Sequence, residues 1–273
     1  MKRILFVSAG KAFPESAFNF LKSLQEQDSI SVTGLFFSAL DYNSMISVSH
    51  IPIGTPYLRL KEGELHEIRA NKEQFARKCT GSYLKFHIHD NEEPWDNHLF
   101  ARETRFADLV VLSGKAFYEE IEAAQPNLFL QEALHTAECP VMIIPEHFVA
   151  PEHICIAYDG SRDSLYAIKQ FCYLFPRYTE LPTEIIYVRE ETSKDIPELE
   201  LLKDFSRLHF TSMSFSKLHF KAAGYFADWI GGKQRVMLVS GSFGRSPFSY
   251  IARQSFARQA VHDHKLPIFI AHT

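Results

Sequence analysis

Two segments of the chain end in the same way at a fixed separation, and this repeat constrains the fold more than any other feature. The apolar runs DLVVLSG, which ends at Gly114, and RVMLVSG, which ends at Gly241, both stop at Ser-Gly. A proline opens another apolar run 26 positions later in each case, at Pro140 and at Pro267, so the offset is 127 residues at both ends. A tandem duplication accounts for this equality. We therefore expect two copies of one structural unit.

The length of the chain suits this expectation. With 273 residues, 46% of them hydrophobic and 23% charged, the chain can form two globular domains that each have their own core. The proline-flanked segment 145–151 predicts a linker, which gives a first domain over residues 1–147 and a second over 151–273.

Short apolar runs alternate with segments of helical periodicity in both copies. The predicted strands are 2–8, 31–37, 83–89, 109–113 and 141–144, then 153–158, 184–188, 208–213, 236–240 and 268–271. The predicted helices between them are 14–27, 64–78, 96–106 and 128–136, then 161–175, 196–205, 218–230 and 250–262. A helix between successive strands forces right-handed crossovers. The predicted fold class is therefore α/β, with two repeated, open, Rossmann-like parallel sheets covered by helices on both faces.

Charge and composition exclude several classes of function. A net charge of −4 and a pI near 6.4 argue against a nucleic-acid surface. No apolar stretch is long enough for a secretory signal or a membrane span, so we expect a cytoplasmic protein without a membrane partner. The four cysteines lack Cys-x-x-Cys spacing and lie mostly in apolar segments, which favours buried reduced thiols.

Ligands of parallel α/β sheets bind beyond the carboxyl ends of the strands, so the residues there are the candidates for chemistry. Asp159 follows the first strand of the second copy and could accept hydrogen bonds from a ribose or hold a metal-bound water. The alternative is a turn residue before Gly160. Ser161 is placed to cap the next helix.

A glycine-rich loop follows the fourth strand of the second copy. Gly241 and Gly244 are separated by two residues, and Arg245 stands before the predicted helix. Backbone N–H groups of such a loop, together with the positive end of a helix, can surround phosphates. Gly-x-x-Gly alone is a weak motif, and its position between a strand and a helix is what favours a phosphate site.

These features together resemble the universal stress protein domain, in tandem and over nearly the whole chain. The resemblance rests on the run AYDGS at 157–161, on GSFGRS at 241–246 and on the prolines that open the closing strands. It implies the adenine nucleotide alpha hydrolase-like form of the fold. It also implies a site for ATP or a related adenine nucleotide, with magnesium as the accompanying ion, at Tyr158, Asp159, Val188, Gly241, Gly244, Arg245, Gln254 and Ser255.

One position departs from the pattern of ATP-binding members, Gly-x2-Gly-x9-Gly-Ser/Thr. Gly241, Gly244 and Ser255 match it, but Gln254 stands where the pattern has glycine. A glutamine side chain would obstruct the approach of a phosphate, or it would donate an amide hydrogen bond to one. We favour obstruction.

The first copy departs further. Ala9 stands at the position of Asp159, Phe117 at the second glycine, and Asn127 and Leu128 at the Gly-Ser pair. We expect this copy to bind no nucleotide. The resemblance also implies an intramolecular pseudo-dimer with the strands 141–144 and 268–271 close together, and a homodimer is a further expectation.

The other motifs are weaker evidence for a functional site. His87 and His89 could ligate a metal, but a polar strand end in an acidic segment explains them better. His262 and His264 fit the end of a helix. The long segment 38–63, found only in the first copy, is either a functional flap or a packing element. The chain has no nucleophile elbow and no Walker lysine, which disfavours an efficient hydrolase and leaves no catalytic residue to name.

Three functions remain open at this point. The first is a cytoplasmic stress-response protein that binds a nucleotide in its second copy and acts as a sensor or adaptor. The second is a protein-interaction module with degenerate sites and an unidentified protein partner. The third is a slow hydrolase of ATP in which Asp159 holds magnesium.

Overall fold

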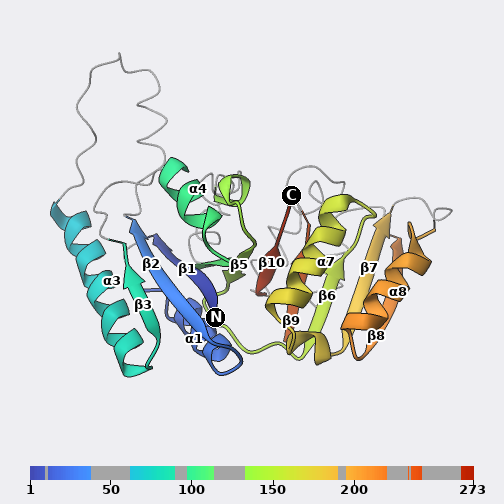
Figure 1. Ribbon diagram of the computed structural model, residues 1–273, viewed down its shortest axis with the longest axis horizontal. Coiled ribbons are helices and arrows are strands. Elements are labelled where there is room, and N and C mark those ends of the chain that lie inside the picture. The colour runs from blue at the N-terminus through green and yellow to red at the C-terminus, as the bar shows by residue number, and fades with distance from the viewer. Residues whose placement is uncertain are drawn as a thin grey trace, which may run out of the picture. The chain divides into compact units, whose positions relative to one another are not determined.

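The computed structural model describes residues 1–9, 12–37, 62–89, 97–113, 133–189, 195–219, 233, 235–241 and 266–273. These residues form two compact units, Met1–Cys139 and Pro140–Thr273 (Figure 1). The boundary lies directly before the strand that the sequence analysis placed last in the first copy. No helix in the described ranges is both long enough and apolar enough to cross a membrane.

The first unit contains a parallel sheet in the order β3-β2-β1-β4. Its elements are β1 (Lys2–Ala9), α1 (Glu15–Gln25), β2 (Ile30–Phe37), α3 (Glu62–Gly81), β3 (Lys85–Ile88), α4 (Asn97–Arg105) and β4 (Leu109–Ser113). The apolar run in β1 is buried on both faces of the sheet, since Ile4 to Val7 are all buried. Such a continuous apolar sequence is typical of a strand inside a parallel sheet. The predicted alternation of strands and helices is confirmed here.

Phenylalanines fill the core of the first unit. The rings of Phe6 and Phe75 stack with centroids 5.1 Å apart, and Phe18 and Phe36 meet Phe75 edge to face at 6.2 and 5.5 Å. Gly34 lies beneath this cluster, where a Cβ atom would stand 2.7 Å from the ring of Phe36 and 2.9 Å from the ring of Phe75. The high phenylalanine content therefore serves packing in this unit.

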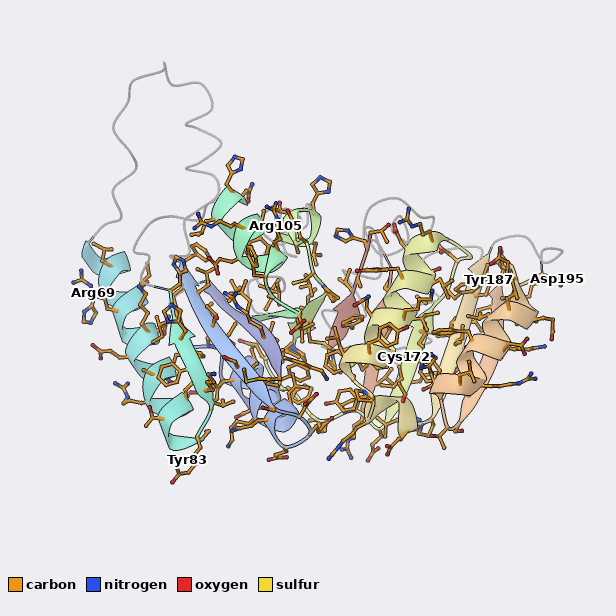
Figure 2. The ribbon with its side chains drawn as sticks, viewed as in Figure 1. Arg69, Tyr83, Arg105, Cys172, Tyr187 and Asp195 are labelled. Atoms are coloured by element: carbon orange, nitrogen blue, oxygen red, sulfur yellow. The ribbon has the colours of Figure 1, made fainter. Side chains whose placement is uncertain are left out.

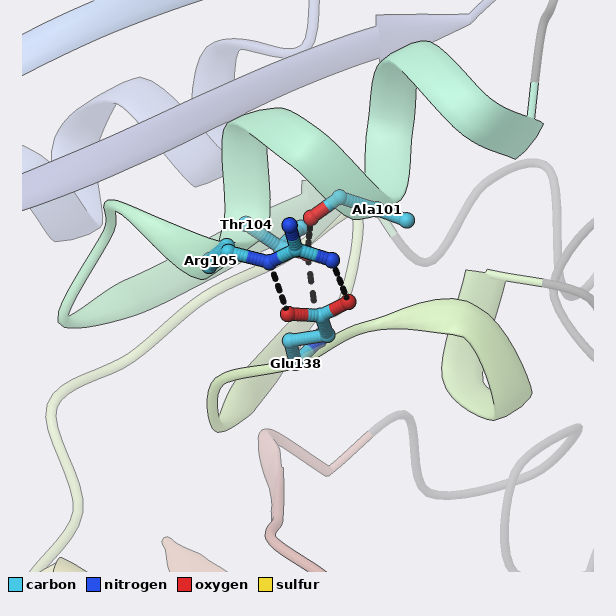
Figure 3. A network of polar contacts seen from close by, with 4 residues as sticks. All are labelled: Ala101, Thr104, Arg105 and Glu138. Carbon is cyan, nitrogen blue, oxygen red and sulfur yellow. Dashed lines mark hydrogen bonds and ion pairs between the residues drawn. The ribbon is translucent and has the colours of Figure 1, made fainter.

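A polar network joins α4 to the segment before β5 (Figure 3). The Arg105 guanidinium donates two hydrogen bonds to the Glu138 carboxylate, at 2.6 and 2.7 Å. The buried Thr104 hydroxyl accepts from the backbone N–H of Glu138 at 3.1 Å and donates to the carbonyl of Ala101 at 2.9 Å. The hydrogen bond and charge of Arg105 hold the pKa of Glu138 below its usual range.

This ion pair predicts a pH dependence. Because the pKa of Glu138 is lower in the folded chain, its contribution to stability is present above the unfolded pKa of about 4.3 and is lost as the pH falls through the folded pKa. Wild type is expected to be more stable than Glu138→Gln at neutral pH, and the difference should shrink from about pH 5 to pH 3. Urea unfolding across this range is the measurement. A difference that stays constant down to pH 3 would contradict the assignment.

The second unit contains a sheet in the order β5-β10-β9-β6-β7-β8. Its elements are β5 (Val141–Ile144), β6 (His153–Ala157), α7 (Arg162–Leu174), a short 3-10 helix (Tyr178–Glu180), β7 (Thr183–Arg189), α8 (Leu199–His209), β8 (Met213–His219), β9 (Val236–Ser240) and β10 (Ile268–Ile270). All neighbours are parallel except β5, which pairs antiparallel with β10 from Ile143↔Ile268 to Val141↔Ile270. The two closing strands thus lie side by side, while the predicted pseudo-two-fold axis stays a prediction.

One strand was misplaced in the sequence analysis. The predicted strand 208–213 is wrong, because α8 continues to His209 and β8 begins at Met213. The predicted helix 218–230 also starts too early, since β8 pairs with β7 as far as His219↔Arg189. The error has a physical cause: Leu208 belongs to an apolar stripe on the exposed side of α8, and an apolar residue here is equally typical of the start of a buried strand.

The core of the second unit lies between α7 and the sheet. Phe171 and Phe175 of α7 contact Phe269 of β10 at centroid distances of 5.7 and 5.6 Å. Cys172 lies on the same helix and is buried (Figure 2). Burial raises the pKa of all four cysteine thiols to about 12, so thiolate chemistry is suppressed at neutral pH.

Candidate functional site

The candidate site lies where β6 and β9 end. β6 has β7 on one side and β9 on the other, so the chain leaves β6 toward β7 while β9 enters the sheet on the opposite side. This arrangement is a topological switch point, the place where open α/β sheets bind ligands. Pairing of the two strands runs to Ile156↔Val239, and the candidate residues follow immediately.

The loop after β6 is a tight turn built by side chains. The Asp159 carboxylate accepts the backbone N–H of Ser161 at 2.9 Å, and Gly160 adopts the left-handed region at φ +80°. The Ser161 hydroxyl caps α7 by accepting the N–H of Ser164 at 3.1 Å, as expected, while the Ser164 hydroxyl donates to the Ser161 carbonyl at 2.9 Å. Asp159 therefore has the turn role that was its alternative interpretation.

Gly241 has a packing role of its own. A Cβ atom there would lie 2.7 Å from the backbone nitrogen of Ser164 and 2.8 Å from the carbonyl carbon of Asp163. The end of β9 is therefore pressed against the first turn of α7, at a distance that only glycine permits. Phosphate binding by this glycine stays a prediction, whereas the backbone contact requires glycine here whether or not a phosphate binds.

The positive end of α7 is already neutralised. Asp163 lies in the first turn of the helix, and its carboxylate accepts hydrogen bonds from the Thr273 hydroxyl at 2.8 Å and the Thr273 backbone N–H at 3.3 Å. A carboxylate here favours the helix but repels a phosphate.

Tyr158 is a core residue at the base of the site. Its hydroxyl donates to the carbonyl of Pro197 at 3.1 Å, and its side chain is only 2% exposed. Burial raises the pKa of Tyr158, and the nearby carboxylates of Glu198 and Asp159 raise it further. The Pro197 ring lies against Gly160, where a Cβ atom would be 2.7 Å away.

Sequence reasoning missed the contribution of the segment before α8. Glu198 precedes α8 in the left-handed conformation, at φ 51°, and Pro197 before it lies over the loop after β6. Tyr187 and Asp195 are labelled at the same end of this unit in Figure 2. No motif at Pro197 signals its contact with Gly160, because this contact depends on how close two segments distant in the sequence come in space.

The structure brings together Tyr158, Asp159 and Gly241, with Val188 near the end of the adjacent β7. The other predicted site residues, Gly244, Arg245, Gln254 and Ser255, lie outside the described residues. In the first unit β1 ends at Ala9 and β4 at Ser113. The other compared positions, Gly114, Phe117, Asn127 and Leu128, also lie outside the described ranges, as does most of the segment 38–63.

One of the two strand-end histidines, His89, has an acidic neighbour. Lys85–Ile88 forms β3, and the Nε2 atom of His89 lies 3.4 Å from the Glu103 carboxylate. Arg3 also reaches Glu103 at 3.4 Å. Across the described part of the chain, no group of three or more His, Cys, Asp or Glu side chains is arranged to hold a metal ion. His262 and His264 lie outside the described part.

Comparison with solved structures establishes the fold. A universal stress protein from Archaeoglobus fulgidus DSM 4304 superposes with a TM-score of 0.66 at 14% identity, over 99% of this chain and 96% of that chain. A functionally unknown protein from Pseudomonas aeruginosa PAO1 gives a TM-score of 0.56 at 11% identity, over 100% and 92%. A structure assigned to the universal stress type, from Pseudomonas aeruginosa UCBPP-PA14, gives 0.56 at 12% identity, over 100% and 93%. The sequence itself matches no protein-family profile and no curated protein. The chain has the universal stress protein fold, which confirms the predicted α/β class.

Proposed function

We propose that this chain, which has the universal stress protein fold along its whole length, is a cytoplasmic stress-response protein of that type. In this proposal the second unit binds ATP or a related adenine nucleotide, and the chain acts as a sensor or adaptor toward a protein partner. Magnesium would enter with the nucleotide phosphates. The sequence supports nucleotide binding without fast chemistry, because it has Asp159 and a glycine-rich run from Gly241 but neither a nucleophile elbow nor a Walker lysine.

The observation that carries this proposal is the placement of Asp159 and Gly241. They follow β6 and β9, the two neighbouring strands that flank the topological switch point. In the proposed site, Asp159 would accept hydrogen bonds from ribose hydroxyls, and the glycine-rich sequence that begins at Gly241 would supply backbone N–H groups to phosphates. Asp163 in the first turn of α7 supports the same placement of the nucleotide, because its carboxylate repels phosphates from the start of that helix.

The two copies are not equivalent in this proposal. β1 ends at Ala9, which has no side chain able to accept a ribose hydrogen bond, whereas Asp159 follows β6. We propose one nucleotide per chain, bound by the second unit. A crystal soaked with ATP is the direct check, and density beside Gly114 would overturn this assignment.

Asp159→Asn separates the turn role of this residue from its ligand role. The asparagine carbonyl can still accept the N–H of Ser161, so the melting temperature should change little. The charge-assisted bond to the nucleotide would be lost, and affinity for ATP should fall about tenfold or more, as expected for a hydrogen bond to a charged group.

The matched control is Glu152→Gln, which removes the same charge next to the other end of β6, where Glu152 pairs with Arg235. Calorimetry on both variants should show weaker binding only for Asp159→Asn. Equal affinities for ATP in the two variants would remove Asp159 from the site. Absence of binding in wild type as well would favour the interaction module, and turnover of bound ATP would favour the slow hydrolase.

A further inference from the structure

α8 presents two apolar faces rather than one. Leu202 and Ser206 are buried beneath the helix. Leu201, Phe205 and Leu208 follow the spacing i, i+4, i+7 and form a second stripe, in which Leu201 is 69% and Leu208 82% exposed. A helix on the surface of a globular domain normally has one apolar stripe, so the second stripe calls for its own explanation.

Aromatic residues extend this stripe toward α7. The ring of His209 lies 4.5 Å from that of Phe205 and 6.1 Å from that of Tyr173, which is 60% exposed. We call the surface formed by Tyr173, Leu201, Phe205, Leu208 and His209 the α8 face. Single exposed apolar residues are ordinary, but a contiguous patch of this kind marks an interaction site.

The charges along α8 indicate which partner fits. Glu200 lies in the first turn, and Arg207 and His209 lie in the last. Glu200 and Asp204 are bonded to Lys203 and Arg207 of the same helix, at 2.8 and 3.0 Å, and the side chains of Glu200 and Arg207 remain largely exposed. The helix is thus acidic at its start and basic at its end, beside the apolar stripe.

A second copy of the chain complements this surface. When two such helices run antiparallel across a two-fold axis, Glu200 of each faces Arg207 of the other, and Leu201 of each faces Leu208 of the other. The opposed helix dipoles favour the same orientation. The stripe and the charges are therefore satisfied by one symmetric arrangement.

We propose that the α8 face is a self-association surface at which two copies of this chain pair through antiparallel α8 helices. A helix of 11 residues is only about 16 Å long, so the interface belongs to the small class that forms weak, reversible complexes. The expected dissociation constant is on the order of 10 to 100 μM. Self-association would then respond to the concentration of the protein in the cell.

The test is sedimentation velocity on the full chain from about 5 to 500 μM, which brackets the expected constant. Wild type should shift from monomer to dimer. The pair Leu201→Ser with Leu208→Ser should weaken association at least tenfold, and Tyr83→Ser, an even more exposed position in the first unit, should leave it unchanged. Circular dichroism confirms that the variants are folded.

Charge reversal provides a more specific test of the antiparallel pairing. Glu200→Arg alone and Arg207→Glu alone should each weaken association by about tenfold, because each brings like charges together across the axis. The double reversal restores opposite charges and should recover most of the wild-type association. A wild type that stays monomeric at 500 μM, a dimer indifferent to the serine pair, or a double reversal no better than either single change would each overturn the proposal.

Discussion

Phe75→Ala is expected to lower the free energy of unfolding of the first unit by about 3–5 kcal/mol, the cost of a large cavity in a packed core. Phe75 is fully buried at the centre of the phenylalanine cluster, in contact with the rings of Phe6, Phe18 and Phe36. The glycine at 34 shows how closely these rings are packed, since no room remains for a methyl group beneath them. The surrounding side chains are rigid rings that close such a cavity poorly.

Urea unfolding followed by circular dichroism measures this effect, with Phe106→Ala as the control. Phe106 belongs to the same unit and the same residue type but is 64% exposed, so its removal should cost well under 1 kcal/mol. Similar losses for Phe75→Ala and Phe106→Ala would show that the cluster does not form the core of this unit.

Gly241→Ala is expected to destabilise the second unit by about 3 kcal/mol, near the upper end of the usual range for overpacking. The added methyl group would meet backbone atoms of Asp163 and Ser164 rather than the flexible end of a side chain. The end of β9 and the first turn of α7 would have to separate, which also disturbs the cap that Ser161 provides.

Gly81→Ala is the matched control, because the same change at the end of α3 meets nothing within 4 Å. Its effect should be near zero or slightly stabilising, as expected when a glycine in unstrained backbone is replaced. Thermal unfolding of both variants checks the prediction. Full stability in Gly241→Ala would remove the packing role and leave ligand binding as the reason for this glycine.

The parts of the fold that could be predicted from sequence are those whose signal is local. The bounds of β5, β9 and β10 agree with the predicted bounds to within one residue. Strands that are buried on both faces have uninterrupted apolar sequences, which are easy to recognise. The position of β8 could not be predicted in this way. Leu208 faces outward from α8. The sequence pattern around it does not show whether an apolar residue lies on the surface or in the core.

The candidate site could also be predicted only in part, because only some of its features have a local sequence signal. Asp159 and Gly241 could be identified because strand ends and glycine loops are visible in the sequence. Their contacts with Ser161 and with the first turn of α7 could not, since these depend on how close two distant segments come in space. Pro197 is the clearest example, because no motif in the sequence signals its contact with Gly160.

Titration calorimetry of ATP with magnesium into the full chain, and into Gln254→Gly, distinguishes a nucleotide-binding protein from an interaction module. We expect one binding site per chain, with tighter binding in Gln254→Gly if the glutamine side chain obstructs the approach of a phosphate, because glycine would remove this obstruction and free the backbone. Weaker binding by about 1 kcal/mol in that variant would instead identify Gln254 as a hydrogen-bond donor to the nucleotide. Absence of measurable binding in both proteins would contradict the nucleotide function.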